Sequence, residues 1–158
     1  MMITGRVWKD GTMWIAESEI ADVCTQGKSR KDASAMLADA FETLIDRPSC
    51  KITVKEYGDD DSVTIEASEP ATLAAFVLQR LRERGGLSLS QVAATMGRAS
   101  KNAYARYEQG AAVPTIEKFD ELLRAVSADT TLIIGPRTAR KPAIAKRSGP
   151  ASSRRARR

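Results

Sequence analysis

Hydrophobic and polar residues alternate with a period of two in several short segments of the first 70 residues, which predicts β-strands. The first runs from Ile3 to Lys9, and Asp10-Gly11 after it is typical of a tight hairpin turn. Thr12 to Glu17 is the predicted return strand, and Val23 to Gly27 is a third, shorter one. In the return strand, alternation places Trp14 and Ala16 on one face and Met13 and Ile15 on the other.

After the third strand, one segment has its apolar residues at helical spacing, three and four positions apart. Ser29, with Asp32 three residues later, resembles a capping box that begins a helix, and Pro48 ends it. Two more strands are predicted, from Lys51 to Tyr57 and from Ser62 to Ala67, separated by a charged turn. The prediction is an α+β fold, in which one helix packs on a small, largely antiparallel sheet. The helix should bury one apolar stripe, formed by Ala33, Met36, Leu37, Ala40, Phe41, Leu44 and Ile45.

This half resembles the HicB antitoxin domain, which has a partial ribonuclease-H-like fold. The resemblance covers about the first 70 residues and rests on KDGTMWIAE, CTQGKS and DASAMLADAFETL. Members of that family usually carry a proline and a glycine between the second and third strands, where this chain has SEIADV. The resemblance implies a domain that binds and covers a small basic toxin of the HicA type, an RNA-cleaving protein with a double-stranded-RNA-binding-like fold.

From Glu69-Pro70 onward the pattern predicts four helices and no long strand. The first carries Leu73, Phe76, Val77 and Leu81 and ends at Gly85-Gly86. Ser88 or Ser90 caps the second, and Ser100 caps the third. The inner faces are predicted to be Leu89, Val92, Ala93 and Met96 in the second helix, Tyr104 and Tyr107 in the third, and Ile116, Phe119, Leu122, Leu123 and Val126 in a fourth that begins at Pro114-Thr115.

This arrangement is similar to the Cro/repressor helix-turn-helix family, also called XRE-type. The shared features are a small residue before a glycine turn in SQVAATMG, the closing E-x-G in ARYEQG, and the proline of AAVP. Between the turn glycine and the third helix, GRASKNA is one residue longer than the usual pattern. The resemblance implies that the third helix enters the major groove of DNA.

Candidate DNA-contacting residues follow from these positions. Gln91, at the start of the second helix, is predicted to contact a phosphate. Lys101 and Asn102 are predicted to read base edges, and Arg106 to reach a guanine or a phosphate. The alternative is that these are solvated polar residues on an exposed helix. The full predicted set is Gln91, Ser100, Lys101, Asn102, Ala103 and Arg106.

The segment after the fourth helix, Thr130 to Ile134, is a β-branched run that predicts a strand. Pairing with its symmetry mate would make a homodimer suited to a palindromic operator, with pairing inside its own chain as the alternative. From residue 136 the chain lacks apolar periodicity and is expected to be a disordered tail. Its nine basic residues either hold nucleic acid non-specifically or only keep the chain soluble.

Charge is divided unevenly along the chain. Residues 1–70 hold eight basic and fourteen acidic side chains, a balance of −6, whereas residues 71–136 hold eight basic and six acidic ones, a balance of +2. An acidic front suits a basic partner, although single surface acids commonly serve solubility alone. Trp8 and Trp14 are predicted to lie in the core or a dimer interface, with contact to a partner as the alternative.

Composition lowers the expectation of catalysis. The chain has no histidine and only two cysteines, Cys24 and Cys50, so we expect no zinc site, no cofactor and no enzyme activity. A metal-dependent nuclease would need converging carboxylates, and Asp10, Asp39 and Glu42 are not forced together by the pattern. With no signal-peptide pattern and no apolar run near the roughly 20 residues of a membrane helix, we expect a cytoplasmic protein.

The sequence therefore predicts a toxin-binding domain over residues 1–69, a helix-turn-helix domain over residues 70–135 and a basic tail over residues 136–158. The predicted function is that of an antitoxin that neutralises a HicA-like, mRNA-cleaving toxin by binding it and represses its own operon. The predicted partners are operator DNA, the toxin, and a second or further copies of the chain. The alternative is a stand-alone transcription regulator whose front domain senses a small molecule or another protein.

Overall fold

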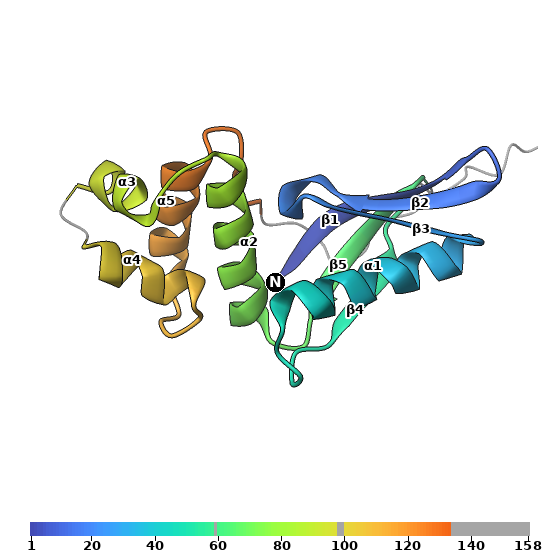
Figure 1. The fold of residues 1–158 in the computed structure, drawn as a ribbon, viewed down its shortest axis with the longest axis horizontal. Helices are drawn as coiled ribbons and strands as arrows, with labels where there is room; N and C mark the ends of the chain where they lie inside the picture. The colour runs from blue at the N-terminus through green and yellow to red at the C-terminus, as the bar shows by residue number, and fades with distance from the viewer. Residues whose placement is uncertain (59, 98–99, 134–158) are drawn as a thin grey trace, which may run out of the picture.

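The computed structural model describes residues 1–58, 60–97 and 100–133. A five-stranded antiparallel sheet with one helix on one face comes first in the chain, and a group of helices follows it (Figure 1). The α+β class predicted from the sequence is confirmed. Within the residues described, the core is one continuous cluster that includes side chains from both parts.

The sheet contains β1 (Met2–Asp10), β2 (Met13–Ser18), β3 (Val23–Gly27), β4 (Ile52–Glu56) and β5 (Ser62–Ala67) in the order β3-β2-β1-β5-β4. Every pair of neighbouring strands is antiparallel, and the predicted fifth strand is present. Asp10 pairs with Met13, so the hairpin loop is Gly11–Thr12, one residue later than predicted. Gly11 has a positive φ of 56°, a conformation that glycine adopts at little cost at the first position of a two-residue loop.

Helix α1 (Arg30–Ile45) packs along one face of the sheet. The Oγ of Ser29 accepts a hydrogen bond from the backbone N–H of Asp32, and the Asp32 carboxylate accepts one from the N–H of Lys28, which closes the N-terminus. Of the predicted stripe, Ala33, Leu37 and Phe41 are buried, but Met36 and Leu44 are 45% and 49% exposed. The prediction of a wide stripe was wrong at these two positions, since the sheet covers only one line of the helix.

The two faces of the sheet differ in what covers them. Trp14 is half-buried on the side of α1, with the guanidinium of Arg30 5.8 Å from its ring centre. Trp8 lies on the opposite face, half-buried next to Ile15, with the Arg6 guanidinium 5.2 Å from its ring centre. Figure 1 shows no described helix over that face at the end where the β1–β2 hairpin turns.

A short 3-10 helix, η1 (Glu19–Ala21), connects β2 to β3 in the segment that lacks the expected proline and glycine. Asp22 takes the left-handed conformation there, with φ 53°. Two arginines of helix α2 (Pro70–Arg84) bind the backbone carbonyls of this connection. The Nε of Arg80 donates to the Ala21 carbonyl at 2.9 Å, and the Nη1 of Arg84 donates to the Glu19 carbonyl at 2.6 Å.

Helix α2 (Pro70–Arg84) lies between the sheet and the remaining helices (Figure 1). It is buried on more than one side, with Thr72, Leu73, Ala74, Ala75, Phe76, Val77, Leu78 and Leu81 all inaccessible. On the side that faces the sheet and α1, the ring of Phe76 meets that of Phe41 edge to face, with ring centres 5.5 Å apart. Toward the other side, α2 packs on the helices that follow it. A helix that is apolar nearly all round is stable only in such an enclosed position.

The remaining helices are α3 (Leu89–Thr95), α4 (Lys101–Glu108) and α5 (Ile116–Val126), close to their predicted bounds. Phe119, Leu122, Leu123 and Val126 bury the apolar face of α5 as predicted. Ile116 was predicted to belong to this face but is 67% exposed, because it lies in the first turn of α5, where the described chain does not cover it.

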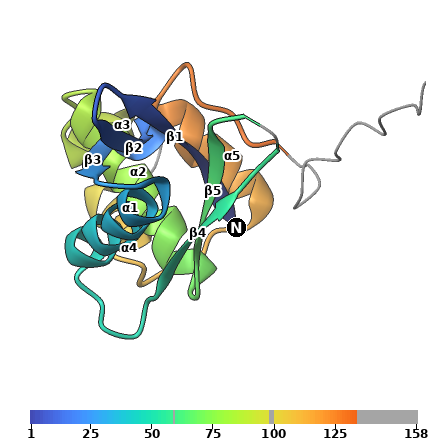
Figure 2. The same cartoon turned by 90° about the vertical axis from the view of Figure 1, so that its right-hand side faces the viewer.

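The strand predicted from Thr130 to Ile134 is not formed in the part that the structure describes, since residues 130–133 belong to no strand. Thr130 and Thr131 line a hollow beside Thr4 of β1 and Ser62 of β5. Figure 2 shows the chain after α5 running back toward the sheet. Both strands already pair on each side, so they offer no free edge for a further strand. Ile134, the basic tail and the two residues following Gly97 lie outside the described residues.

The side chain of Glu42 joins α1 to the sheet at the start of β4. Its Oε1 accepts from the backbone N–H of Ile52 at 2.9 Å and its Oε2 from the Nζ of Lys51 at 3.0 Å. The hydrogen bond from Ile52, and after it the one from Lys51, lower the pKa of Glu42 from its ordinary value of 4.5. A carboxylate with a lowered pKa contributes stability above its unfolded pKa and loses it as the pH falls through the folded pKa.

We therefore expect Glu42→Gln to lower the free energy of unfolding at pH 7, with the difference from the parent shrinking once the pH falls below 4.5. Urea unfolding across a pH series measures it. Asp39→Asn, an exposed change on the same helix, is the control and should show no such trend. A Glu42→Gln deficit that stays constant from pH 7 to strong acid would contradict the role of the charge.

Candidate nucleic-acid interface

Helices α3 and α4 are joined through the predicted glycine turn, in which Gly97 has φ 79°, a left-handed conformation that glycine adopts at little cost. Helix α3 begins with a complete capping box. The Ser88 Oγ accepts from the Gln91 N–H at 3.2 Å, and the Gln91 Oε1 accepts from the Ser88 N–H at 2.8 Å. Its inner residues Val92 and Ala93 are buried, so the small residue allows α3 to lie close to its neighbours.

Helix α4 exposes one polar face. Its N-cap is Ser100, whose Oγ accepts from the Ala103 N–H at 3.0 Å. Tyr104 is buried and Tyr107 is half-buried, which fixes the inward side of the helix. The outward side agrees with the sequence-based expectation, since its exposed residues are Lys101, Asn102, Ala103 and Arg106.

The predicted DNA-contacting residues thus lie on the adjoining helices α3 and α4 and at the N-cap of α4. They differ in whether their side chains are already engaged in hydrogen bonds. Ser100 and Gln91 use their side-chain oxygens in helix caps. Because the Gln91 Oε1 is engaged, its amide Nε2 is left to donate outward, which suits a phosphate oxygen. Lys101 and Arg106 form no ion pair with any described residue, so both cations face solvent unpaired. Their contact with DNA stays a prediction.

An ion pair between α2 and α4, not foreseen from the sequence, holds the exposed helix in place. The Arg82 Nε lies 2.7 Å from the Glu108 Oε1, and the Arg82 Nη2 donates to the Oε2 at 3.0 Å. Arg82 also donates to the Leu87 carbonyl at 3.0 Å. The side chains are only 15% and 8% exposed, and the Glu108 carboxylate raises the pKa of Arg82. Such a pair is strongly oriented, since both partners are planar and bidentate.

The closing E-x-G motif gains a physical meaning from this geometry. Its glutamate is Glu108, and its glycine, Gly110, has φ 66°. The left-handed residue turns the chain so that the Arg106 carbonyl accepts from the N–H of Ala111 at 2.9 Å and of Ala112 at 3.1 Å. The sequence identifies the motif as a family signature, but it does not show that the glutamate pairs with Arg82.

The front part of the chain also reaches α4. Arg47, in the loop after α1, donates from Nη2 to the carbonyl of Gln109 and from Nη1 to the Thr72 Oγ1 at 3.5 Å. A cation beside the C-terminal carbonyls of a helix stabilises it through the helix dipole. The C-terminal end of the exposed helix is therefore in direct contact with the sheet-bearing part of the protein.

The hydroxyl of Tyr104 is buried without a hydrogen-bond partner among the described residues. Burial, and secondarily the neighbouring Glu108 carboxylate, raise the pKa of Tyr104. The ring thus serves the packing of α4 and stays neutral at physiological pH.

Neither a metal-binding cluster nor a membrane-spanning helix is found in the part of the chain that the structure describes. No group of three or more histidine, cysteine, aspartate or glutamate side chains there is arranged to hold a metal ion. Glu42 instead anchors β4, while Asp10 lies at the β1–β2 hairpin. No described helix is long and apolar enough to cross a membrane.

Comparison with known proteins agrees with this geometry. Residues 74–133 match a family of helix-turn-helix domains, which covers α2 after its first turn and extends beyond α5. No curated protein and no solved structure matches the chain significantly. The second part of this protein is therefore a helix-turn-helix domain of the kind that binds DNA and regulates transcription.

The pair between Arg82 and Glu108 generates a stability prediction. Glu108→Ala should lower the free energy of unfolding by about 3–5 kcal/mol, because it removes the bidentate partner of a largely buried guanidinium and leaves that group only a 3.5 Å contact with the Glu83 carboxylate. Thermal or urea unfolding followed by circular dichroism measures the loss. Glu121→Ala, which removes a surface pair with Lys118, is the matched control and should change stability by less than about 0.5 kcal/mol. Equal effects of the two substitutions would show that the buried pair does not hold α4.

The exposed face of α4 generates a binding prediction. Against a duplex selected by the protein from a random pool, Asn102→Ala should weaken binding by about 1–3 kcal/mol and leave binding to unselected duplex nearly unchanged, because an amide reads base edges.

Gln91→Ala should weaken binding to both the selected and the unselected duplex, since a phosphate contact carries no sequence information. Titration by fluorescence anisotropy measures both. Lys31→Ala, an exposed lysine in the first turn of α1, is the control cation. Unchanged affinity of Asn102→Ala for the selected duplex would remove Asn102 from the reading residues.

Proposed function

We propose that this protein is the antitoxin of a type II toxin–antitoxin system. Its front part, residues 1–69, neutralises a HicA-like, mRNA-cleaving toxin by binding it, and its helix-turn-helix domain represses the operon that encodes both proteins. It acts as a homodimer or a higher homo-oligomer. Its targets, an operator and a toxin that attacks mRNA, place its action in the cytoplasm.

The observation that carries this proposal is the sheet face opposite α1. The register places three half-buried residues together there, next to the β1–β2 hairpin: Trp8, Met13 and Ile15. In Figure 1 this hairpin is the part of the sheet remote from the helix-turn-helix domain. An aromatic residue flanked by aliphatic ones on an open face is a typical anchor of a protein interface. This face is available to a partner while α4 is engaged on DNA, since the two lie at opposite ends of the molecule (Figure 1).

Charge supports a basic partner. The front 70 residues have a balance of −6, and several of their acids have no ion-pair partner among the described side chains. Asp10, Asp39 and Asp46 are exposed examples. A surplus of unpaired carboxylates speeds and orients the association with a cationic protein. Inhibition then follows from covering the surface of the toxin, and the antitoxin needs no chemistry of its own.

The alternative is a stand-alone regulator with a sensor domain in front. An apolar pocket within the front part would favour it. The large apolar groove of this structure lies instead at the junction with the helix-turn-helix domain, lined by residues of both parts. We therefore retain the antitoxin as the proposed function.

Co-expression with the product of the neighbouring small open reading frame tests the proposal. We expect rescue of growth and a complex that survives purification. Trp8→Ala in the full chain should abolish rescue while leaving DNA binding intact, whereas Asn102→Ala should retain rescue. Leu44→Ala, on the opposite side of the front part, is the matched apolar control and should rescue like the parent. Absence of both complex and rescue with the parent chain would reject the antitoxin, and undiminished rescue by Trp8→Ala would place the toxin on another surface.

A further inference from the structure

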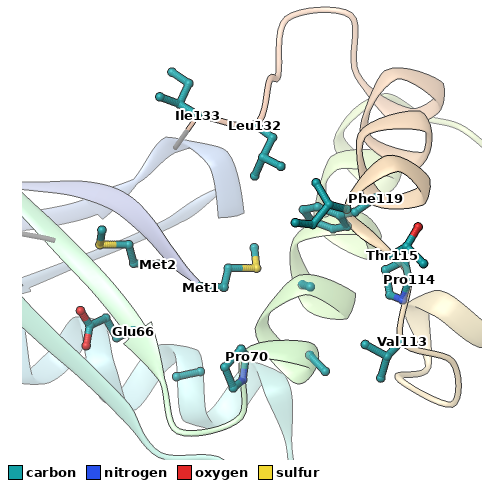
Figure 3. A pocket seen from close by; sticks show the side chains of 14 residues that line it. Met1, Met2, Glu66, Pro70, Val113, Pro114, Thr115, Phe119, Leu132 and Ile133 are labelled. Atoms are coloured by element: carbon teal, nitrogen blue, oxygen red, sulfur yellow. The ribbon is translucent and has the colours of Figure 1, made fainter. Parts of the chain in front are cut away.

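Exposed apolar side chains are concentrated at one place in this structure. Seven large hydrophobic residues of the described chain are exposed, and two of them, Met36 and Leu44, lie apart on α1. The other five line a single groove of about 960 Å³ between the sheet and the helix-turn-helix domain (Figure 3): Met1, Val113, Ile116, Leu132 and Ile133. Such clustering marks an interaction site, because single exposed apolar residues are otherwise scattered over protein surfaces.

The polar groups of the groove do not suit a small ligand. Among its lining residues only Glu66 and Thr115 carry polar side chains, and both already have partners. The Glu66 Oε2 accepts from the Lys55 Nζ at 2.7 Å, and the Thr115 Oγ1 caps α5 by accepting from the Lys118 N–H. Nothing converges on the centre to orient a small molecule, whereas a broad apolar surface suits another protein.

The charge of the lining residues indicates what kind of protein binds in the groove. The single carboxylate of the lining is neutralised by Lys55, so a cationic partner gains no ion pair there. A second copy of this chain fits better. A two-fold interface sets the same patch against itself, and a patch whose one acidic side chain is paired avoids the repulsion between carboxylates that the acidic front of the molecule would suffer against its own copy.

The location of the groove also agrees with DNA reading. Val113 lies in the short loop after α4 and Ile116 is the first residue of α5; they are 74% and 67% exposed. A contact through them fixes one α4 relative to the other. A dimeric helix-turn-helix protein requires such a fixed spacing, since its two reading helices enter successive turns of the major groove, roughly 34 Å apart.

We propose that this groove is the homodimer interface, with Val113, Ile116, Leu132 and Ile133 of each copy packing on the groove of the other. The proposal deepens the proposed function, because it rests on the reading of a two-fold operator by two copies. It replaces a strand-to-strand contact through residues 130–134 with a side-chain interface that includes Met1 of the front part as well as the helix-turn-helix domain.

The test is self-association of the full-length protein by sedimentation equilibrium, without toxin or DNA. We expect a dimer for the parent and about tenfold or greater weakening for Val113→Asp and for Ile116→Asp, since each places two like charges in an apolar contact. Both positions are mostly exposed in the single chain, so folding should persist, and circular dichroism checks it. Leu44→Asp, an equally apolar exposed position on α1, should leave the dimer unchanged.

A monomeric parent at the highest concentration reached, or a dimer that both groove variants preserve, would overturn the proposal. A dimer weakened equally by Leu44→Asp would overturn it as well. Because neither toxin nor operator is present, failure of the antitoxin hypothesis leaves this result standing, and a failed dimer leaves the toxin-binding test unaffected.

Discussion

The burial of α2 from two sides is the constraint on which the rest of this structure depends. A helix whose apolar residues surround its axis needs cover all round, and neither the sheet with α1 nor the three later helices supplies that alone. Phe76 meets Phe41 on one side, while α4 and α5 pack on the other. The same helix therefore completes two structural units, and their cores merge into one.

Arginine side chains reinforce this arrangement at places where apolar packing gives no direction. Arg80 and Arg84 bind backbone carbonyls of the β2–β3 connection, and Arg47 binds the carbonyl at the end of α4. Arg82 pairs with Glu108 inside the helix-turn-helix domain. Hydrophobic burial is non-directional, whereas these bidentate or carbonyl-directed contacts fix one orientation. The exposed face of α4 is thereby held by contacts from both parts of the chain.

Much of the fold could be predicted because its signals are local. Strand alternation, the Ser29 and Ser100 caps, the helix start at Pro114-Thr115 and the glycine turn at Gly97 each depend on a few neighbouring residues, and each was found at or within one residue of its predicted place. Of the two candidate caps of α3, the structure uses Ser88. The exposed residues of α4 followed from helical spacing in the same way. The predictions that failed depend on which other parts of the folded chain lie next to a residue. Residues 130–133 form no strand within their own chain, because β1 and β5 beside them are already paired on both sides.

The sequence by itself determined the order and type of the elements, the helix-turn-helix pattern and the residues that α4 turns outward, because periodicity and capping act over one or two turns of chain. Only the tertiary structure decided that Glu108 meets Arg82, that Arg47 reaches the end of α4, and that Met1, Ile116 and Ile133 share one groove. These contacts join residues distant in the chain. Their geometry depends on how α2 is packed on both sides, and no local pattern records it.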